Sequence, residues 1–195
     1  MIIGITGGSG CGKTTALQAI AQLGGTVIDC DAVYHQLLRT DFHLLDTIKS
    51  HFPGTVTNGV LDRKALAAIV FSDECALKTL NRITHSAVSA KVRSLLETAD
   101  NLAAIDAIAL LESGLSDLCD VTVAITAPEE DRIGRLIQRD GISRELALQR
   151  IRAQKEESYF RENCDYLLEN AGSHEDFQEK CLVFFRDLTI IKENP

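Results

Sequence analysis

The sequence has little proline, no internal repeat and no long apolar run. Three prolines and 13 glycines in 195 residues exclude a low-complexity chain. No segment recurs at a period of about 20–50 residues, which excludes a solenoid. No run approaches roughly 18 consecutive apolar residues, so the sequence predicts no membrane-spanning helix. One globular domain is expected, because 45% of the residues are hydrophobic and the chain is long enough to bury a full core.

An excess of positive charge is also lacking. The formal net charge is −8, which argues against non-specific binding to nucleic acid. A small anionic ligand is still allowed, because a few local donors can override the net field. The opening residues, "MIIGITGG", contain no basic residue and too short an apolar stretch for a signal peptide. We therefore expect a cytoplasmic protein without a nucleic-acid or membrane partner.

Cysteine is present but lacks the spacing of a metal site or a disulfide framework. No two cysteines form a C-x-x-C pair, and none has a histidine at ligand spacing. Their separation is also too wide for a small disulfide scaffold. We interpret them as free thiols, most of which are buried as small hydrophobic groups. They are Cys11, Cys30, Cys75, Cys119, Cys164 and Cys181.

The chain opens with a strand–helix–strand unit. Residues 2–6 are apolar and predict a short buried strand, and residues 13–23 carry apolar side chains at helical spacing. Gly24 and Gly25 end this helix, and the β-branched run 26–29 predicts a second strand. Such a unit implies a parallel sheet.

A long helical block follows, and then strands return. Residues 31–100 are mainly helical by their apolar spacing, with a break at "FPGTVTNG". The block is too long for a simple crossover and predicts an inserted helical region. The later elements are predicted as strands at 102–110 and 120–126, a helix with Thr126 and Glu129 at capping-box spacing, a helix opened by Ser143 over 143–160, a strand and turn at 165–172, and a helix at 174–192.

The segment "GGSGCGKT", residues 7–14, matches the pattern G-x-x-x-x-G-K-[ST]. Glycines let the backbone approach a ligand closely, and successive amides at a helix start attract anions. In this pattern Lys13 reaches the β- and γ-phosphates and the Thr14 hydroxyl binds Mg²⁺. The dinucleotide fingerprint G-x-G-x-x-G fails, because from Gly8 its last glycine position is Lys13. Since the pattern lies between a strand and a helix, it predicts nucleotide phosphate binding.

Two carboxylates follow the second predicted strand. Asp29 and Asp31 lie at its carboxyl end, which is the edge where ligands bind in open α/β sheets. A carboxylate there can take a proton from an attacking hydroxyl. Either residue could instead be a helix cap or a turn residue. We favour Asp31 over Asp29 for the catalytic role.

Three arginines share one face of a predicted helix. Arg132, Arg135 and Arg139 are spaced i, i+3 and i+7. We interpret Arg132 as part of a solvated face that pairs with the acidic residues before it. Arg139 lies beside Gly141, and an arginine next to a glycine hinge suits a mobile lid that closes on phosphates.

Seven segments together resemble the dephospho-coenzyme A kinases. They cover nearly the whole chain in the family's order: TGGSGCGKTT, VIDCDAVYHQLL, GVLDRKALAAIVF, LNRITHSAV, LLESGL, RLIQRDGISRELALQRIRAQ and DYLLENAG. The V-I-D-x-D, L-D-R-x-x-L and Q-R-D parts are the most specific. Enzymes of that family are P-loop kinases that transfer the γ-phosphate of ATP to the ribose 3′-hydroxyl of dephospho-coenzyme A, the last step of coenzyme A synthesis.

The resemblance implies an α/β fold with a five-stranded parallel sheet flanked by helices, a helical substrate region and a lid. Within a single domain of residues 1–195, the core would comprise 1–31, 101–136 and 159–195. The substrate region would span about 32–100 and the lid about 137–158. ATP and Mg²⁺ would be the cofactors and dephospho-coenzyme A the substrate. The expected state is a monomer or a small homo-oligomer.

The resemblance also implies roles for individual residues. Asp31 would be the catalytic base, and Lys13 and Arg139 would act with it. Nucleotide binding is expected from Gly8, Gly10, Cys11, Gly12, Lys13, Thr14, Thr15 and Asn170, the last of these near adenine. Substrate binding is expected from Asp31, Arg63, His85, Leu111 and Glu112. Thr14 would hold Mg²⁺, and Asp106 would hold one of its waters unless it is a capping or turn residue.

The chain departs from the family at two prolines, and two other functions stay open. The family usually has His-Pro where this chain has His85-Ser86, and a proline where it has Ala109. Proline supplies no reacting group, so both departures concern the grip on substrate. The alternatives are a P-loop kinase for another nucleoside or sugar, and a nucleotide-binding switch without kinase activity. The segments LDRKAL and LNRITH favour the coenzyme A precursor, and no N-K-x-D guanine signature occurs.

Overall fold

Residues 1–193 are described by a computed structural model, in which the chain divides into two compact units. The sheet unit comprises Met1–Ile28, Ala99–Leu111 and the chain from Leu115 onward. The helical unit comprises Asp29–Thr98 and Glu112–Gly114. The last two residues of the predicted core segment 159–195 lie outside the described residues.

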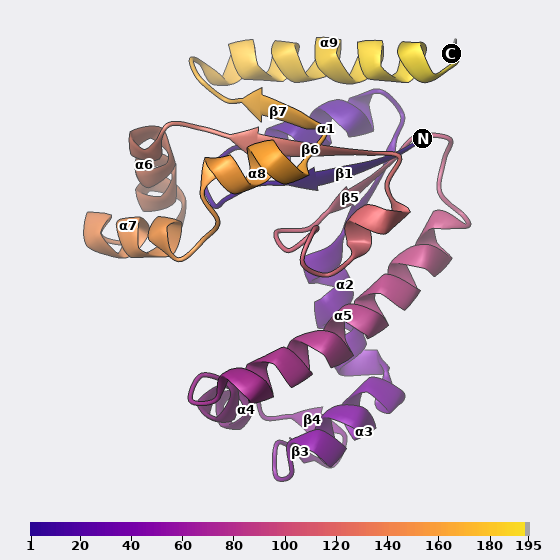
Figure 1. Ribbon diagram of the computed structural model, residues 1–195, viewed down its shortest axis with the longest axis vertical. Coiled ribbons are helices and arrows are strands. Elements are labelled where there is room, and N and C mark those ends of the chain that lie inside the picture. The colour runs from indigo at the N-terminus through magenta and orange to yellow at the C-terminus, as the bar shows by residue number, and fades with distance from the viewer. Residues whose placement is uncertain (194–195) are drawn as a thin grey trace. The chain divides into compact units, whose positions relative to one another are not determined.

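The sheet unit is built on a five-stranded parallel sheet in the order β2–β5–β1–β6–β7 (Figure 1). Its strands are β1 (Ile2–Thr6), β2 (Thr26–Asp29), β5 (Ala103–Asp106), β6 (Val121–Thr126) and β7 (Tyr166–Glu169). The central strand is β1, in which Gly4 lies opposite Ile105 of β5 and Thr122 of β6. This sheet confirms the predicted fold class. The loop that follows β1 therefore leaves the middle of the carboxyl edge, where open α/β sheets bind ligands.

Helices pack on this sheet through one main apolar core. α1 (Lys13–Gln22) and α9 (His174–Glu193) contact each other, and their buried side chains join those of the strands in a single cluster. Ile3 and Ile5 of β1 and Phe185 of α9 are fully buried there. The remaining helical elements of the unit are η1 (Leu115–Leu118), α6 (Glu129–Asp140), α7 (Arg144–Arg152) and α8 (Glu157–Asn163). α1 begins directly after the glycine-rich loop. Because α1 is packed in the core, the N-terminal end of the helix, where the loop joins it, is held in place.

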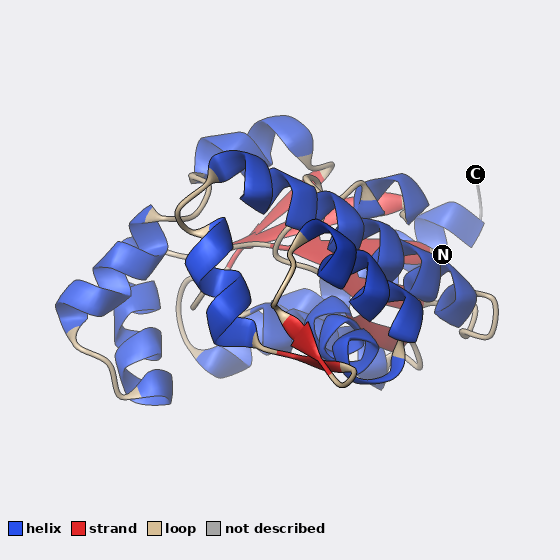
Figure 2. Ribbon diagram, turned by 90° about the horizontal axis from the view of Figure 1, so that it is seen from below, coloured by secondary structure: helices blue, strands red, loops and turns tan. Residues whose placement is uncertain are grey.

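The helical unit consists of four helices and a short hairpin, and helices predominate over strands throughout the chain (Figure 2). Its helices are α2 (Cys30–Thr40), α3 (Phe42–His51), α4 (Arg63–Val70) and α5 (Glu74–Leu96). Each begins with an aspartate whose carboxylate accepts backbone N–H bonds of the first turn, namely Asp29, Asp41, Asp62 and Asp73. None of the helices in residues 1–193 is long and apolar enough to cross a membrane.

Three local predictions are wrong. The strand predicted over 102–110 is too long, because β5 spans only Ala103–Asp106. The predicted break at "FPGTVTNG" is real, and it contains strand β3 (Val56–Thr57), which pairs as an antiparallel hairpin with β4 (Val60–Leu61) directly after it. The capping box at Thr126 and Glu129 does not form, because Thr126 still belongs to β6 and Pro128 stands at the N-cap. The helix predicted over 143–160 is two helices, since α7 ends at Arg152 and α8 begins at Glu157.

Candidate active site

The loop between β1 and α1 has positive φ angles at Gly7, Gly10 and Gly12, and the first and last of these show why only glycine fits. Gly7 has φ +134°, and a Cβ atom there would lie 2.2 Å from the carbonyl oxygen of Ile125. Gly12 has φ +98°, and its Cβ would lie 2.1 Å from Nδ2 of Asn170. A positive φ strains any other residue, and both contacts are with groups held in place by the fold. The glycines thus keep the loop close to β6 and to the segment after β7.

Three side chains from two distant segments, α6 and the residue after β7, hold successive carbonyl groups of this loop. Nε of Arg132 donates to the carbonyl oxygen of Ser9 at 3.0 Å, and Arg135 donates to that of Gly10 at 3.0 Å. Nδ2 of Asn170 donates to the carbonyl oxygen of Cys11 at 2.8 Å. In a trans peptide the C=O of one residue and the N–H of the next point in opposite directions. Holding these carbonyls on one side therefore turns amides of the following residues toward the other side, as an anion-binding nest requires.

Arg132 and Arg135 contact the phosphate loop, and neither contact was predicted from the sequence. Arg132 was predicted on a solvated face beside its acidic neighbours, and that prediction is wrong, because its guanidinium bonds Ser9 and Gln154 instead. Arg135, to which no role was given, bonds both Gly10 and Oδ1 of Asn170. Their shared helix face was visible in the sequence. The face that packs on the loop was not, since it depends on how α6 is rotated in the fold.

Lys13, Thr14 and Thr15 begin α1 with three different environments. Nζ of Lys13 donates to the carbonyl oxygen of Gly7 at 2.9 Å, so its ammonium group lies over the loop. The side chain of Thr14 is exposed, whereas Thr15 is buried and its N–H donates to the carbonyl oxygen of Gly12 at 3.1 Å. An exposed hydroxyl beside a lysine at a helix start matches the Mg²⁺ and phosphate ligands that the sequence pattern predicts.

Cys11 faces the core rather than the ligand side of the loop. Its side chain is 3% exposed and belongs to the main apolar cluster. Burial raises the pKa of the Cys11 thiol, and the positive charges of Arg132 and Lys13 oppose this rise. The thiol is therefore protonated at neutral pH, and only the backbone of Cys11 is placed to contact a nucleotide.

Asp106 is the last residue of β5, which pairs with β1, the strand that leads into the phosphate loop. It lies opposite Ile5 in the register of β1 and β5, and its Oδ1 atom is buried. The Asp106 carboxylate and the Thr14 hydroxyl are hard oxygen donors of the kind that Mg²⁺ prefers. No cluster of three or more His, Cys, Asp or Glu residues with metal-binding geometry exists in residues 1–193. This donor set fits Mg²⁺ that takes most of its ligands from nucleotide phosphates and water.

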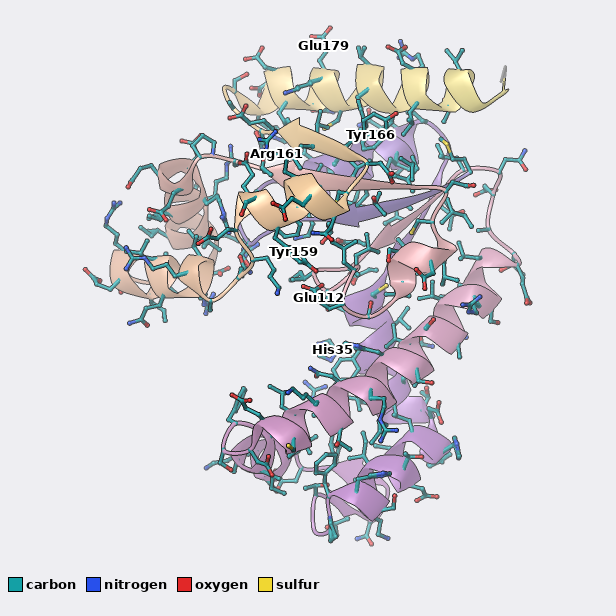
Figure 3. All side chains as sticks on the ribbon, viewed as in Figure 1. His35, Glu112, Tyr159, Arg161, Tyr166 and Glu179 are labelled. Carbon is teal, nitrogen blue, oxygen red and sulfur yellow. The ribbon has the colours of Figure 1, made fainter. Side chains whose placement is uncertain are left out.

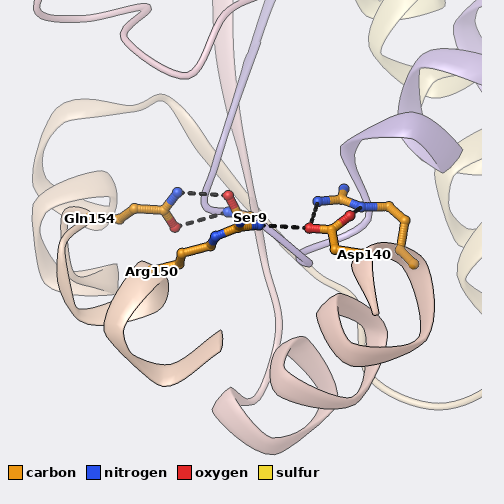
Figure 4. Close-up of polar contacts among 5 residues, drawn as sticks. Ser9, Asp140, Arg150 and Gln154 are labelled. Atoms are coloured by element: carbon orange, nitrogen blue, oxygen red, sulfur yellow. Dashed lines mark hydrogen bonds and ion pairs between the residues drawn. The ribbon is translucent and has the colours of Figure 1, made fainter. Parts of the chain in front are cut away.

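The predicted lid, about 137–158, contains the end of α6 and all of α7, and these two helices share a small apolar core. Its members are Ile133, Leu136, Ala147 and Ile151. Arg139 ends this arm with its side chain 65% exposed, and its Nε donates to Oδ1 of Asp140 at 2.7 Å. Arg150 donates to Oδ2 of the same carboxylate at 2.8 Å (Figure 4). The Arg139 hydrogen bond is the main reason that the pKa of Asp140 lies below its ordinary value. Arg139 is thus held by Asp140 in this structure, away from the loop carbonyls that Arg132 and Arg135 contact.

In the helical unit, Asp29 and Asp31 begin the same helix but differ in role. Oδ1 of Asp29 accepts a hydrogen bond from the N–H of Ala32 at 2.9 Å, so Asp29 is the N-cap of α2. Asp31 lies in the first turn, and its side chain is exposed. Of the two carboxylates considered as catalytic base, Asp31 is therefore the one that does not cap the helix.

Arg63 begins α4 beside an apolar cavity of the helical unit. The cavity has a volume of about 180 Å³, and its lining includes Tyr34, Arg63 and apolar residues of α2, β4, α4 and α5. The Arg63 guanidinium lies 3.2 Å from Nδ1 of His35, a residue marked in Figure 3. Burial raises the pKa of Tyr34, while the charge of Arg63 opposes the rise. A guanidinium beside an apolar cavity is suited to a substrate that carries both phosphate and an apolar arm.

The remaining predicted substrate residues fall in two places. His85, on α5, is half-buried, and burial lowers its pKa, an effect that the carboxylate of Glu112 opposes. Glu112, marked in Figure 3, is exposed and belongs with His85 to the helical unit. Leu111 precedes it in the sheet unit and is half-buried. Two of the three, His85 and Glu112, thus interact with each other.

A comparison with known families decides what kind of kinase this loop belongs to. The family model described as dephospho-CoA kinase matches residues 1–176. The chain belongs to the dephospho-CoA kinase family. The resemblance seen in the sequence is therefore confirmed, and the match includes the phosphate loop, α6, α7 and Asn170.

Individual members of the dephospho-CoA kinase family resemble the chain over nearly its whole length. The dephospho-CoA kinase of Thermus thermophilus is 37% identical over 193 residues, which are 97% of this chain and 92% of that protein. A crystal structure from Thermus thermophilus has a TM-score of 0.78 at 35% identity and covers 96% of this chain and 97% of its own. The dephospho-CoA kinase from Campylobacter jejuni has a TM-score of 0.69 at 27% identity, covering 96% of each chain. The matches therefore extend over nearly the whole of each chain.

Proposed function

We propose that the protein transfers the γ-phosphate of ATP to the ribose 3′-hydroxyl of dephospho-coenzyme A, which gives coenzyme A. The observation that carries the proposal is the phosphate loop, whose carbonyls are held by Arg132, Arg135 and Asn170. Such bracing keeps the loop amides oriented before ligand arrives, so little reorganisation is needed when phosphate charge develops. Membership of the dephospho-CoA kinase family supports the choice of acceptor.

On the nucleotide side, we assign binding to the loop and the start of α1. The amides of Gly8, Gly10, Cys11 and Gly12 would surround the phosphates, with Lys13 as the mobile cation. Thr14 would ligate Mg²⁺, and Asp106 would hold one of its waters. When bound, Mg²⁺ would neutralise charge on the β- and γ-phosphates. Lys13 would leave the Gly7 carbonyl to contact a phosphate, which exchanges a neutral acceptor for a charged one.

On the acceptor side, we assign proton transfer to Asp31. Its carboxylate is exposed and is not used as a helix cap, so it is available to orient the 3′-hydroxyl and accept its proton. Arg63 and His85 would contact the substrate, together with Leu111 and Glu112. The lowered pKa of His85 keeps its imidazole neutral at pH 7, so it would act as a hydrogen-bond partner rather than as a cation.

The lid and the adenine contact complete the proposal. Residues of about 137–158 would close over the nucleotide, and Arg139 would exchange Asp140 for the transferring phosphate. Asn170 would lie near adenine as well as under the loop. Residues of about 32–100 would form the substrate region. The cytoplasmic location and the state as monomer or small homo-oligomer stay predictions.

A phosphotransfer assay tests this function. The protein would be incubated with ATP, Mg²⁺ and a panel of acceptors that contains dephospho-coenzyme A, nucleosides and sugars. Coenzyme A itself serves as the matched control, because its 3′-oxygen already carries phosphate. We expect ADP and coenzyme A to form in equal amounts from dephospho-coenzyme A, and no transfer to coenzyme A. Faster transfer to another acceptor, or ATP hydrolysis without any transfer, would contradict the proposal.

A further inference from the structure

The side-chain amide of Gln154 occupies the outer end of the phosphate loop. Its Oε1 accepts a hydrogen bond from the backbone N–H of Ser9 and another from the Arg132 guanidinium, each at 2.9 Å. Its Nε2 donates to the hydroxyl oxygen of Ser9 at 2.8 Å (Figure 4). The amide orientation is well determined by these partners, since the oxygen faces two donors. Gln154 thus contacts a residue 145 positions away, from the link between α7 and α8.

The two donors on Oε1 are those that a phosphate oxygen would use. One is a backbone N–H of the loop, and the other is a guanidinium that also bonds the Ser9 carbonyl. A phosphate oxygen carries more charge than an amide oxygen and makes charge-assisted bonds to both. The space is fully used, because a Cβ atom at Gly8 would lie 2.3 Å from Arg132 and 2.9 Å from Oε1 of Gln154. Gln154 therefore fills a position that is shaped for an anionic oxygen.

The position along the loop indicates which phosphate belongs there. Ser9 precedes α1 by four residues, whereas Lys13 and Thr14 begin that helix. In this pattern the Lys13 ammonium group reaches the β- and γ-phosphates, and here it lies over the opening residues of the loop, where Nζ donates to the carbonyl oxygen of Gly7 at 2.9 Å. The oxygen that meets Ser9 and Arg132 then belongs to the outermost group.

We propose that Oε1 of Gln154 stands in for an oxygen of the terminal phosphate of ATP and is displaced by it. The inference rests on the proposed function, since it requires ATP to bind this loop. ADP lacks the third phosphate and leaves Gln154 on Ser9. ATP displaces Gln154 from Ser9, and this frees the link between α7 and α8 from the loop. Gln154 is thus a positioning residue through which the lid distinguishes ATP from ADP.

The proposal fixes the sign of two substitutions. Gln154→Ala removes the competitor for the two donors, so the affinity for an ATP analogue should rise about three- to tenfold, while ADP binding changes less than about twofold. Gln154→Glu places a carboxylate on the same donors and binds Arg132 more strongly. The affinity for the ATP analogue should then fall by about tenfold or more, and the affinity for ADP should fall by less.

Calorimetry with Mg²⁺, ADP and a non-hydrolysable β,γ-imido analogue of ATP measures these affinities. Gln149→Ala and Gln149→Glu are the matched controls, because Gln149 is an exposed glutamine on α7 of the same arm. Thermal unfolding checks that each variant is folded. A second readout is the ¹⁵N spectrum of the parent protein, where the Ser9 amide and the Gln154 side-chain amide should shift strongly with the ATP analogue and little with ADP.

Each other outcome overturns the proposal in a recognisable way. Equal weakening of both nucleotides by Gln154→Ala would make Gln154 a brace of the loop. If Gln154→Ala raises the affinity for both nucleotides equally, Oε1 of Gln154 lies where an inner phosphate binds. If variants of Gln154 and Gln149 behave alike while the parent binds nucleotide, only this inference fails. If the parent binds neither nucleotide, the proposed function fails as well.

Discussion

Replacing Asn170 by alanine tests whether the loop is held from beneath by this one side chain. Asn170 is 5% exposed, and its amide links two parts of the site. Nδ2 donates to the carbonyl oxygen of Cys11 at 2.8 Å, and Oδ1 accepts from Arg135 at 3.2 Å. The substitution removes both bonds at once. It leaves a buried carbonyl and one arm of a guanidinium to find other partners.

The cost follows from these two contacts. A buried carbonyl that loses its donor costs about 1–3 kcal/mol, and the longer bond to Arg135 adds roughly 1 kcal/mol. Water that enters the space of the missing amide reduces this cost in part. We expect about 1.5–3 kcal/mol to act on the loop conformation that binds phosphate, which corresponds to a roughly 10- to 100-fold loss of nucleotide affinity. The melting temperature should fall as well.

Calorimetry with two ligands separates support of the loop from a contact with adenine. ATP carries the base, whereas inorganic tripolyphosphate presents only the phosphates, and both are measured with Mg²⁺. If Asn170 acts through the loop, both ligands lose affinity by similar factors. If it acts only through adenine, the tripolyphosphate affinity is unchanged. The latter result would refute the reasoning from the loop contacts.

Two further variants control this experiment. Asn163→Ala removes an exposed asparagine whose only described bond runs to the carbonyl oxygen of Tyr159 within α8, so it should leave both affinities unchanged. Asn170→Asp keeps an acceptor for Arg135 but loses the donor to Cys11. It should also weaken both ligands, because a carboxylate oxygen then faces the Cys11 carbonyl.

Three further substitutions test the proposed catalytic roles. Lys13→Ala should lower turnover at saturating ATP by about a hundredfold or more without unfolding the protein, because phosphate charge loses its cation; an unchanged turnover number would remove Lys13 from catalysis. Arg139→Ala should lower turnover by up to roughly a thousandfold with little change in dephospho-coenzyme A binding, and equal rates would return it to the solvated surface. Asp31→Asn should keep ATP affinity by calorimetry but slow transfer by at least about a hundredfold, since an amide is a poor base. Near-normal transfer would point to another carboxylate, and loss of ATP binding would make Asp31 a metal or structural residue.

Much of the sheet unit could be predicted because its signals are local. The strands at 2–6 and 26–29 have the predicted bounds, and Ser143 caps α7 as expected by accepting from the N–H of Leu146. Short β-branched runs, glycine pairs and N-caps act within a few residues, so one sequence is enough to recognise them. The phosphate loop is the extreme case, since its glycines, lysine and threonine are contiguous.

The hairpin of the helical unit has one local signal in the sequence, at its turn. Asn58 has φ +52° and Gly59 has φ +74°, which are the left-handed values of a tight hairpin turn. Asn-Gly between β-branched residues favours such a turn. The flanking strands have two residues each, so their alternation was too short to recognise.

The division of the helix predicted over 143–160 follows from a contact that no local pattern contains. Residues after Arg152 are polar and helix-compatible, so propensity alone extends the helix. The chain instead turns at Gln154, whose amide gains three hydrogen bonds with Ser9 and Arg132. Tertiary bonds to a fixed loop outweigh the small propensity of a few exposed residues. The site therefore explains the break in secondary structure, and not the reverse.

The roles of the three arginines on α6 differ because they lie at different heights along one helix face. An α-helix rises about 1.5 Å per residue, so Arg139 stands about 10 Å farther along the axis than Arg132. Arg132 and Arg135 contact the loop from the first turns, whereas Arg139 is held at the other end by Asp140. In the proposed mechanism, Arg139 would contact a phosphate on the loop after its bond to Asp140 opens. An interaction gained in that way contributes to the transition state more than to nucleotide binding, which is why its loss should appear in turnover rather than in affinity.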